Sequence, residues 1–229
     1  MRAATGGIAA VVVILGVAIA LVFNPLWIGF EQERTGVPAI TGWTSEQVRA
    51  ATDSILADLV FGPPSFSVAV DGRPVLDAAE RSHMVDVRNV VLPATMVFAV
   101  AVALLATLLA TSRRRAWLWR AIAVGSGALT VAGVVAGIAV LFFFDAAFLL
   151  FHLVFFPQGN FSFDPGTQRL TQLFPEQFWT ETAIAIAVVG LLIGAGVTVA
   201  ARRQAGRLQR RGFADQAQGW ARSTSSDPR

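Results

Sequence analysis

Four long runs of apolar residues alternate with polar segments along the chain and predict four membrane-spanning helices. Each run holds about 20 residues with few charges, the length that an α-helix needs to cross the hydrocarbon core of a bilayer. The predicted spans occupy residues 1–28, 90–111, 122–144 and 182–201. The predicted polar segments occupy residues 29–89, 112–121, 145–181 and 202–229. The pattern therefore predicts an all-α integral membrane protein with four transmembrane helices.

The flanks of the first run indicate an uncleaved signal anchor. Arg2 lies at its start, and Pro25 and Trp27 mark its far interface with water. Residues 18–20 resemble a signal-peptidase site, but they lie inside the apolar run. We therefore expect this helix to stay in the protein as its first span.

The first polar segment, 29–89, predicts a small extracytoplasmic cap. Thr44 and Gln47 suit a capping box, and apolar residues then recur at helical spacing as far as Leu59. Residues 66–70 suit a strand that ends in a turn at 71–72. This cap is expected either to pack over the membrane helices or to bind a partner.

Glycines share one face of the third predicted span and one face of the fourth. Small residues at this spacing let two helices approach each other closely in a membrane. The glycines concerned are Gly125, Gly133 and Gly137 in the third span and Gly190 and Gly194 in the fourth. Close helix packing is the expected result.

The apolar character of the third span continues past its expected end. A helix running on to Phe156 would hold about 35 residues and be about 50 Å long, whereas the hydrocarbon core is about 30 Å thick. We therefore expect the helix to break or turn near Asp145 and to continue as a re-entrant or interfacial segment. Such a segment would place His152 at the outer membrane surface among phenylalanines.

Charge is distributed unequally between the two sides of the predicted membrane. With the amino terminus in the cytoplasm, the inner segments carry 12 arginines and two acidic residues, and the outer segments carry six arginines and 13 acidic residues. This bias follows the positive-inside rule and places both histidines outside. The tail after Arg202 is predicted to be basic, cytoplasmic and disordered at its end.

The residue inventory narrows the possible chemistry. The chain is 55% hydrophobic and 14% charged, which excludes an ordinary soluble domain. All 18 basic residues are arginine, and cysteine and tyrosine are absent, so thiol nucleophiles, Schiff-base lysines and phenolic acids are excluded. The net charge is only +3, and the sequence contains no Walker or dinucleotide fingerprint. Binding of nucleic acid or nucleotides is therefore not expected.

The chain has only two histidines, and both have acidic neighbours at helical spacing. Glu80, His83 and Asp86 lie at i, i+3 and i+6, near one helix face, so a carboxylate could fix the tautomer of the histidine. Asp145 and His152 are seven residues apart, two turns along one face. Ionisable groups in such apolar segments are candidates for function. The alternative is a pair of interfacial histidines that bond to backbone carbonyls.

Three kinds of chemistry remain open. The first is acid/base catalysis by the two histidines, because imidazole has a pKa near ambient pH. The second is a metal site of both histidines with carboxylates from Asp86, Asp145 or Asp164, although no HExxH motif supports it. The third is a serine nucleophile such as Ser82 or Ser162, although no G-x-S-x-G motif is present.

The histidine motifs resemble those of a known family. Glu80-x-x-His83-Met84-x-Asp86-Val87 is followed, after the third span, by Phe151-His152-x-x-Phe155-Phe156. Phe163-Asp164-Pro165 and Leu173-Phe174-Pro175 come next. Together these motifs resemble the lipoprotein intramolecular transacylases, a family of bacterial membrane proteins. The likeness covers nearly the whole chain, including the four spans and the large first outer loop.

The resemblance implies an acyltransferase. Members of this family move the sn-2 acyl chain of a diacylglyceryl-modified lipoprotein to the α-amine of its amino-terminal cysteine, which gives the lyso form. The resemblance places the catalytic pair at His83 and His152. Donor ester and acceptor amine belong to one substrate, so proximity supplies much of the rate, and no enzyme nucleophile, metal or other cofactor is expected.

The roles of the two histidines follow as a hypothesis from this reaction. His152 would take the proton of the attacking amine, and His83 would stabilise the oxyanion or protonate the leaving alkoxide, although the reverse assignment is also open. Glu80 or Asp86 would orient His83, and Asp145 or Asp164 would orient His152.

The expected partners are diacylglyceryl lipoproteins and membrane lipids, whose polar groups Arg88 and Arg169 could hold. The alternative for both arginines is a solvated position at the interface. We expect a monomer in the bacterial cytoplasmic membrane, with both termini in the cytoplasm and the active site on the outer face. Two other functions remain open: a membrane hydrolase or transferase for another lipid, and a non-enzymatic protein that binds a partner through its outer loop.

Overall fold

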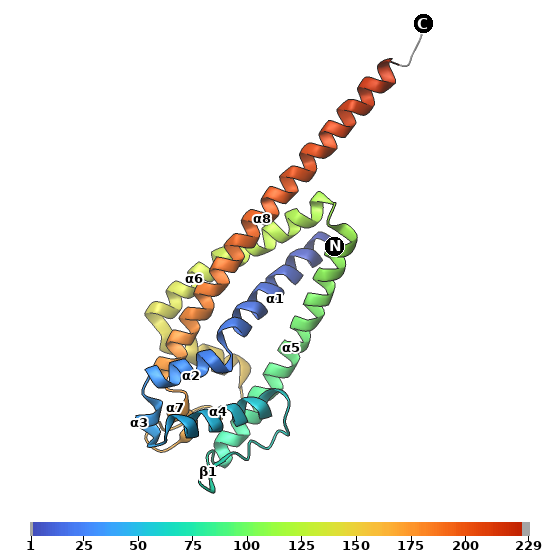
Figure 1. Cartoon of the computed structure of the whole chain (residues 1–229). Helices are drawn as coiled ribbons and strands as arrows, with labels where there is room; N and C mark the ends of the chain where they lie inside the picture. The colour runs from blue at the N-terminus through green and yellow to red at the C-terminus, as the bar shows by residue number, and fades with distance from the viewer. Residues whose placement is uncertain (1, 226–229) are drawn as a thin grey trace. The chain divides into compact units, whose positions relative to one another are not determined.

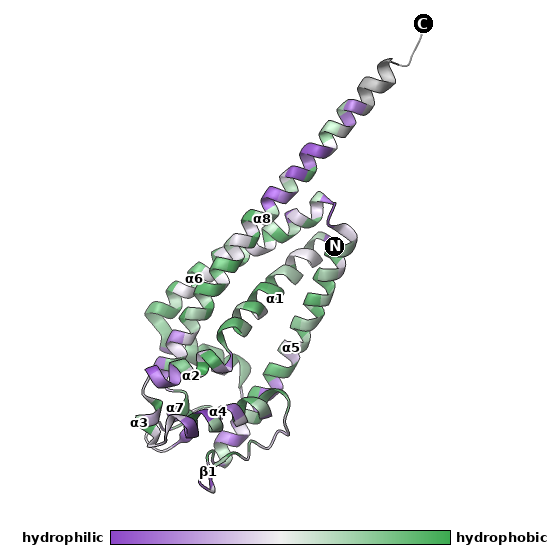
Figure 2. Cartoon of the chain, viewed as in Figure 1, coloured by the Kyte–Doolittle hydropathy of each residue, from purple (hydrophilic) through white to green (hydrophobic). Residues whose placement is uncertain are grey.

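The computed structural model describes residues 2–225, and most of them are helical (Figure 1). Four of the described helices are long and apolar enough to cross a membrane: α1 (Arg2–Val22), α5 (Ala78–Ser112), α6 (Ala116–Phe155) and α8 (Glu176–Ser225). This confirms the prediction of four spans. Figure 2 shows hydrophobic residues along these helices and hydrophilic residues in the second half of α8.

Three of the long helices extend beyond the predicted spans. α5 begins before His83, and α6 includes His152. α8 continues to Ser225, where the sequence predicts a disordered end, and residues 226–229 of that predicted tail lie outside the described residues.

The chain divides into two compact units. One unit contains residues 1–16, 98–133 and 190–229, and the other contains residues 17–97 and 134–189. The second unit holds both histidines and all the short elements of the fold.

The short elements of the second unit lie in the segment predicted as a cap and in the loop before α8. They are α2 (Pro25–Arg34), α3 (Val37–Thr41), α4 (Ser45–Val60), β1 (Ala69–Val70), β2 (Arg73–Pro74) and α7 (Arg169–Leu173). The predicted capping box is present at α4, where Thr44 and Gln47 satisfy each other's backbone amides. The predicted turn at Asp71–Gly72 joins β1 to β2, which pair antiparallel.

One apolar core joins these elements to the starts of α5 and α8. Ile28, Ile55, Phe66, Leu173 and Phe178 are fully or almost fully buried in it, and they come from five different segments of the chain. Burying a side chain of this size contributes about 1.5–3 kcal/mol. This core fixes the start of α5, the helix that carries His83.

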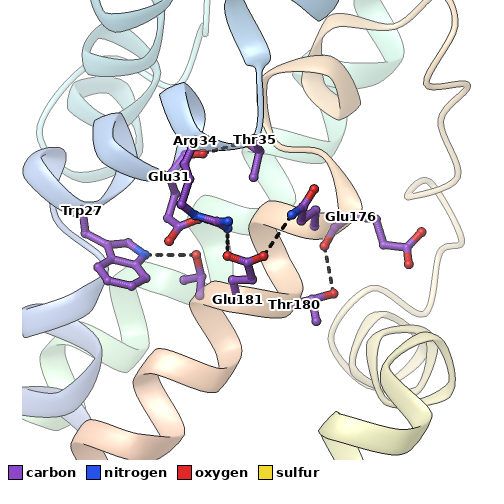
Figure 3. Close-up of polar contacts among 9 residues, drawn as sticks. Trp27, Glu31, Arg34, Thr35, Glu176, Thr180 and Glu181 are labelled. Carbon is purple, nitrogen blue, oxygen red and sulfur yellow. Dashed lines mark hydrogen bonds and ion pairs between the residues drawn. The ribbon is translucent and has the colours of Figure 1, made fainter.

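Polar contacts fasten α2 to the first turns of α8 (Figure 3). Arg34 pairs with Glu31, at 2.8 Å, and with Glu181. The indole Nε1 of Trp27 donates to the hydroxyl of Thr182 at 3.1 Å. The Glu31 carboxylate is almost fully buried, so its ion pair offsets the cost of removing the charge from water.

A kink in α6 changes the direction of the helix before it reaches His152. Phe143 has φ −138° and ψ 42°, outside the helical region, and the helix resumes after it. The sequence predicts a break near Asp145, two residues later. The whole of α6 has 40 residues, which at 1.5 Å per residue exceeds the hydrocarbon thickness by about 30 Å.

In the other unit, glycines let helices approach each other closely. A Cβ added to Gly125 in α6 would lie 2.5 Å from the carbonyl oxygen of Gly7 in α1. A Cβ added to Gly194 in α8 would lie 2.7 Å from the hydroxyl of Thr130 in α6. The hydroxyls of Ser126 and Thr198 also meet, at 2.8 Å. The glycine spacing in these helices therefore corresponds to close packing, as small residues in membrane helices generally do.

Candidate active site

A capping box fixes the start of α5 and so the direction in which His83 points. Asp77 Oδ1 accepts a hydrogen bond from the Glu80 amide at 2.8 Å, and Glu80 Oε2 accepts one from the Asp77 amide at 2.7 Å. Gln168 donates to Asp77 Oδ2 at 2.9 Å. Hydrogen bonds from Glu80 and Gln168 lower the pKa of the Asp77 carboxyl, because they stabilise its charged form.

His83 lies one turn after Glu80 and is almost completely shielded from solvent, with 6% of its surface exposed. Its ring meets Phe156 edge to face, with centroids 4.9 Å apart, and Phe163 with centroids 5.4 Å apart. Both phenylalanines lie in the loop that follows α6, so this loop forms an apolar wall of the site.

His152 lies in the part of α6 that follows the kink, and 8% of its surface is exposed. Its Nδ1 is 2.8 Å from the carbonyl oxygen of Phe148, one turn earlier. A carbonyl oxygen can only accept, so Nδ1 carries the proton and the lone pair of the neutral ring is on Nε2. The rings of Phe148, Phe156 and Phe161 surround it, with centroids 4.1, 5.5 and 5.0 Å away.

The two imidazoles lie face to face. Their centroids are 6.1 Å apart and their planes differ by 22°. Phe156 contacts both rings, so a single side chain helps set their spacing. Two neighbouring imidazoles provide two groups of the kind that serves as general acid or general base.

The loop after α6 also supplies a polar side chain. Gly159 has φ +77°, a conformation that favours glycine, and its amide donates to the Phe156 carbonyl at 3.0 Å. This turn presents Asn160, whose Nδ2 donates to Oδ2 of Asp86 at 2.6 Å. Asp86 is thus linked to the loop that covers the histidines.

The three other acidic residues named as candidates have different surroundings. Glu80 uses its second oxygen, Oε1, to accept from the Leu170 amide at 2.6 Å, which fastens α7 to α5. Asp164 is exposed and accepts from the Gly166 amide and the Thr167 hydroxyl, and these bonds lower the pKa of its carboxyl. Asp145 is exposed and makes no polar contact with the described residues.

Both candidate arginines bind backbone carbonyls. Arg88, half-buried on α5, donates to the carbonyl of Asp58 at the end of α4. Arg169 donates to the carbonyl of Thr41 at 2.9 Å and to the side chain of Gln172 at 2.7 Å. Its guanidinium also lies 4.8 Å from the ring centre of Trp43. These contacts tie together the short helices of the cap.

Within residues 2–225, no group of three or more histidine and acidic side chains could hold a metal ion. Ser82 and Ser162 are exposed, and neither has a hydrogen bond to a histidine in this part of the chain. Among the described residues, the candidates for these three chemistries that lie together and buried are the two histidines.

Sequence reasoning missed Asn160, Phe161 and Phe163 as parts of the site. Phe161 contacts His152, and Phe163 contacts His83. Phe156, which contacts both imidazoles, was among the phenylalanines expected to shelter His152. The position of the three missed residues after His152, in a turn with several phenylalanines, is the one signal that points to them.

Comparisons with known proteins agree with this geometry. The profile of one family, described as lipoprotein intramolecular transacylase Lit, matches residues 5–179. A solved structure of the membrane-integral lipoprotein intramolecular transacylase Lit from Bacillus cereus is 18% identical, with a TM-score of 0.72, and the match covers 93% of this chain and 96% of that one.

Two variants of the same Bacillus cereus protein, each with one histidine replaced, also match. The arginine variant has a TM-score of 0.64 at 18% identity, and the match covers 93% of this chain and 92% of that one. The alanine variant has a TM-score of 0.67 at 18% identity, with 91% and 94% covered. No curated protein matches the sequence. The chain belongs to the lipoprotein intramolecular transacylase (Lit) family, and it is a multi-pass membrane acyltransferase.

Proposed function

We propose that this protein moves the sn-2 acyl chain of a diacylglyceryl lipoprotein to the α-amine of its amino-terminal cysteine, with His83 and His152 as the catalytic pair. The observation that carries the proposal is the buried, face-to-face pair of imidazoles, with ring centroids 6.1 Å apart, surrounded by aromatic rings. The family supports an intramolecular acyl transfer by this chain.

The reaction moves one proton from nitrogen to oxygen. The amine nitrogen attacks the ester carbonyl carbon, and the bond from that carbon to the glyceryl oxygen then breaks. The nitrogen loses a proton and the glyceryl oxygen gains one, so the reaction consumes no proton overall. Because donor and acceptor belong to one molecule, holding them in the right orientation removes a large part of the activation free energy.

The two imidazoles suit the two proton transfers. His152 has its lone pair on Nε2, because Nδ1 donates to the Phe148 carbonyl, and so it can take the amine proton. The proton then passes from His152 to Nε2 of His83, which gives it to the departing glyceryl oxygen. Both rings end in the neutral form in which they began. Each proton transfer is worth about 10²- to 10⁴-fold in rate.

The surroundings of His152 suit an acyl chain. On the same part of α6, Phe151 and Phe155 are 49% and 44% exposed. In a membrane, such surfaces face lipid, so a diacylglyceryl group can reach the histidines without entering water. We place the protein in the bacterial cytoplasmic membrane, with the site on the outer face, in keeping with the charge bias of its loops.

The test is mass spectrometry of lipoprotein amino-terminal peptides from bacteria that lack their own N-acylating enzyme. Expression of the chain should produce an N-acyl, S-monoacylglyceryl cysteine. His83→Ala and His152→Ala should each lower its yield at least about 100-fold at unchanged membrane abundance. Full activity of both variants would contradict the two-histidine mechanism. Loss of the sn-2 chain without N-acylation would identify a hydrolase instead.

A further inference from the structure

Two buried polar atoms near the active site have no partner among residues 2–225. They are Nδ1 of His83 and Oδ1 of Asn160. An unsatisfied buried group costs about 1–3 kcal/mol, and in native proteins such groups need a physical explanation. Here the two atoms are complementary, because an imidazole nitrogen can donate and an amide oxygen can only accept.

The side chain of Asn160 lies near His83, because it bonds to Asp86, which follows His83 by one turn on α5. Its orientation is set from the other side. Asp86 Oδ2 can only accept, so the group that faces it at 2.6 Å is the Nδ2 of Asn160. The Oδ1 of the same amide is therefore the atom left for His83.

We propose that Asn160 is a positioning residue that accepts a hydrogen bond from Nδ1 of His83, and that Asp86 acts on His83 through Asn160. Asp86 fixes the amide, the amide fixes the tautomer of the imidazole, and Nε2 is left to exchange protons with the substrate. The catalytic part of this inference rests on the proposed function of His83.

In this arrangement both histidines carry their fixed proton on Nδ1. His152 holds its Nδ1 proton against the Phe148 carbonyl. In the proposed arrangement, His83 holds its own Nδ1 proton against the Asn160 amide. In each ring Nε2 is then the atom whose proton comes and goes. The partner of His83 is a side chain on the loop after α6, so substrate contacts that move this loop also act on the histidine.

The first test reads the tautomer of His83 directly. The chain has only two histidines, so His152→Ala, purified with a tag that contains no histidine, leaves a single imidazole for ¹⁵N nuclear magnetic resonance. We expect neutral His83 to carry its proton on Nδ1. Addition of Asn160→Leu should shift the ring toward the Nε2–H form, which free histidine favours in water. An unchanged tautomer in the Asn160→Leu protein would overturn the inference.

The second test measures acyl transfer in the chain with both histidines. Asn160→Leu should lower kcat about 10- to 100-fold with little change in KM, as is typical for residues that orient a catalytic group. Asp86→Leu should behave similarly, and Asp86→Asn should lose less, because its side-chain oxygen still accepts from Asn160. Asn89→Leu is the matched control, since Asn89 is exposed on the same helix as His83.

The two tests separate this inference from the proposed function. If no form of the protein transfers acyl chains but Asn160 sets the tautomer of His83, the proposed reaction fails and the positioning role stands. If the wild-type protein is active and Asn160→Leu retains full kcat with an unchanged tautomer, the positioning role fails and the reaction stands.

Discussion

Glu80 shows how a carboxylate beside a candidate catalytic histidine can hold the fold together. It is 1% exposed, and its two oxygens accept from the backbone amides of Asp77 and Leu170. One of these bonds starts α5, and the other joins α7 to it. Its oxygens are thus occupied by the backbone next to His83, whereas Asp86 faces the loop that covers the histidine.

Glu80→Ala should therefore destabilise the protein. Removing the carboxylate leaves two backbone donors unsatisfied at a buried position, which should lower the free energy of unfolding by about 2 kcal/mol or more. Thermal unfolding in detergent measures this effect. Glu46→Ala is the control, because Glu46 is an exposed glutamate in the first turn of α4. A Glu80→Ala protein of normal stability but without activity would show instead that Glu80 acts on His83.

Part of the candidate site could be predicted from local sequence. His83 and His152 stand out because an ionisable residue in an apolar segment is costly. Spacing alone could not identify which of their acidic neighbours contacts a histidine, because it does not show whether a carboxylate faces an imidazole or a backbone amide. Asn160 was not predicted because its proposed role depends on a contact with Asp86, which lies 74 residues earlier in the chain. No local pattern encodes such a contact.

At the level of elements, the sequence predicts those helices whose start signals are local. The Thr44 and Gln47 capping box marked the start of α4 correctly. The start of α5 was missed: Asp77 and Glu80 also form a capping box, but polar residues follow them and hide the continuity with the second span. The length of the apolar run indicated that the third span must break, but it gave only the approximate position of the kink at Phe143.

Close packing of helices gives a prediction for α6. Gly125→Ala should lower stability, because the added Cβ would lie 2.5 Å from a backbone oxygen of Gly7 and force α1 and α6 apart. Overpacking of this kind costs about 1–3 kcal/mol, which outweighs the gain in helix propensity of about 1 kcal/mol. Thermal unfolding in detergent, or protease resistance in membranes, measures the difference.

Gly196→Ala is the matched control for this substitution. Gly196 lies in α8, and a Cβ added to it would meet nothing within 4 Å. The same change of residue should therefore leave stability unchanged or raise it slightly. Equal stability of the Gly125→Ala and Gly196→Ala proteins would show that the approach of Gly7 and Gly125 does not determine helix packing.

At the level of the whole molecule, an even number of spans and the distribution of charge together predict an orientation. Four spans would return the chain to its starting side, so we expect both termini on one face of the membrane. The segments predicted on that face carry 12 of the 18 arginines, and those predicted on the other face carry 13 of the 15 acidic residues. Both histidines are then expected on the acidic side. A lipoprotein substrate carries its acyl chains in the membrane, so a site at the outer interface would meet the ester without extracting the lipid.

The absence of cysteine makes this orientation directly testable. We predict that Ser65→Cys, in the exposed loop after α4, reacts with a membrane-impermeant maleimide in intact spheroplasts, because residues 29–89 should lie outside. Ala214→Cys, exposed on the second half of α8, should react only after the membrane is permeabilised. Each variant is the other's control for reagent access and membrane integrity. Labelling with the opposite pattern would place the histidine pair on the cytoplasmic face, where it could not act on lipoproteins that have already been exported.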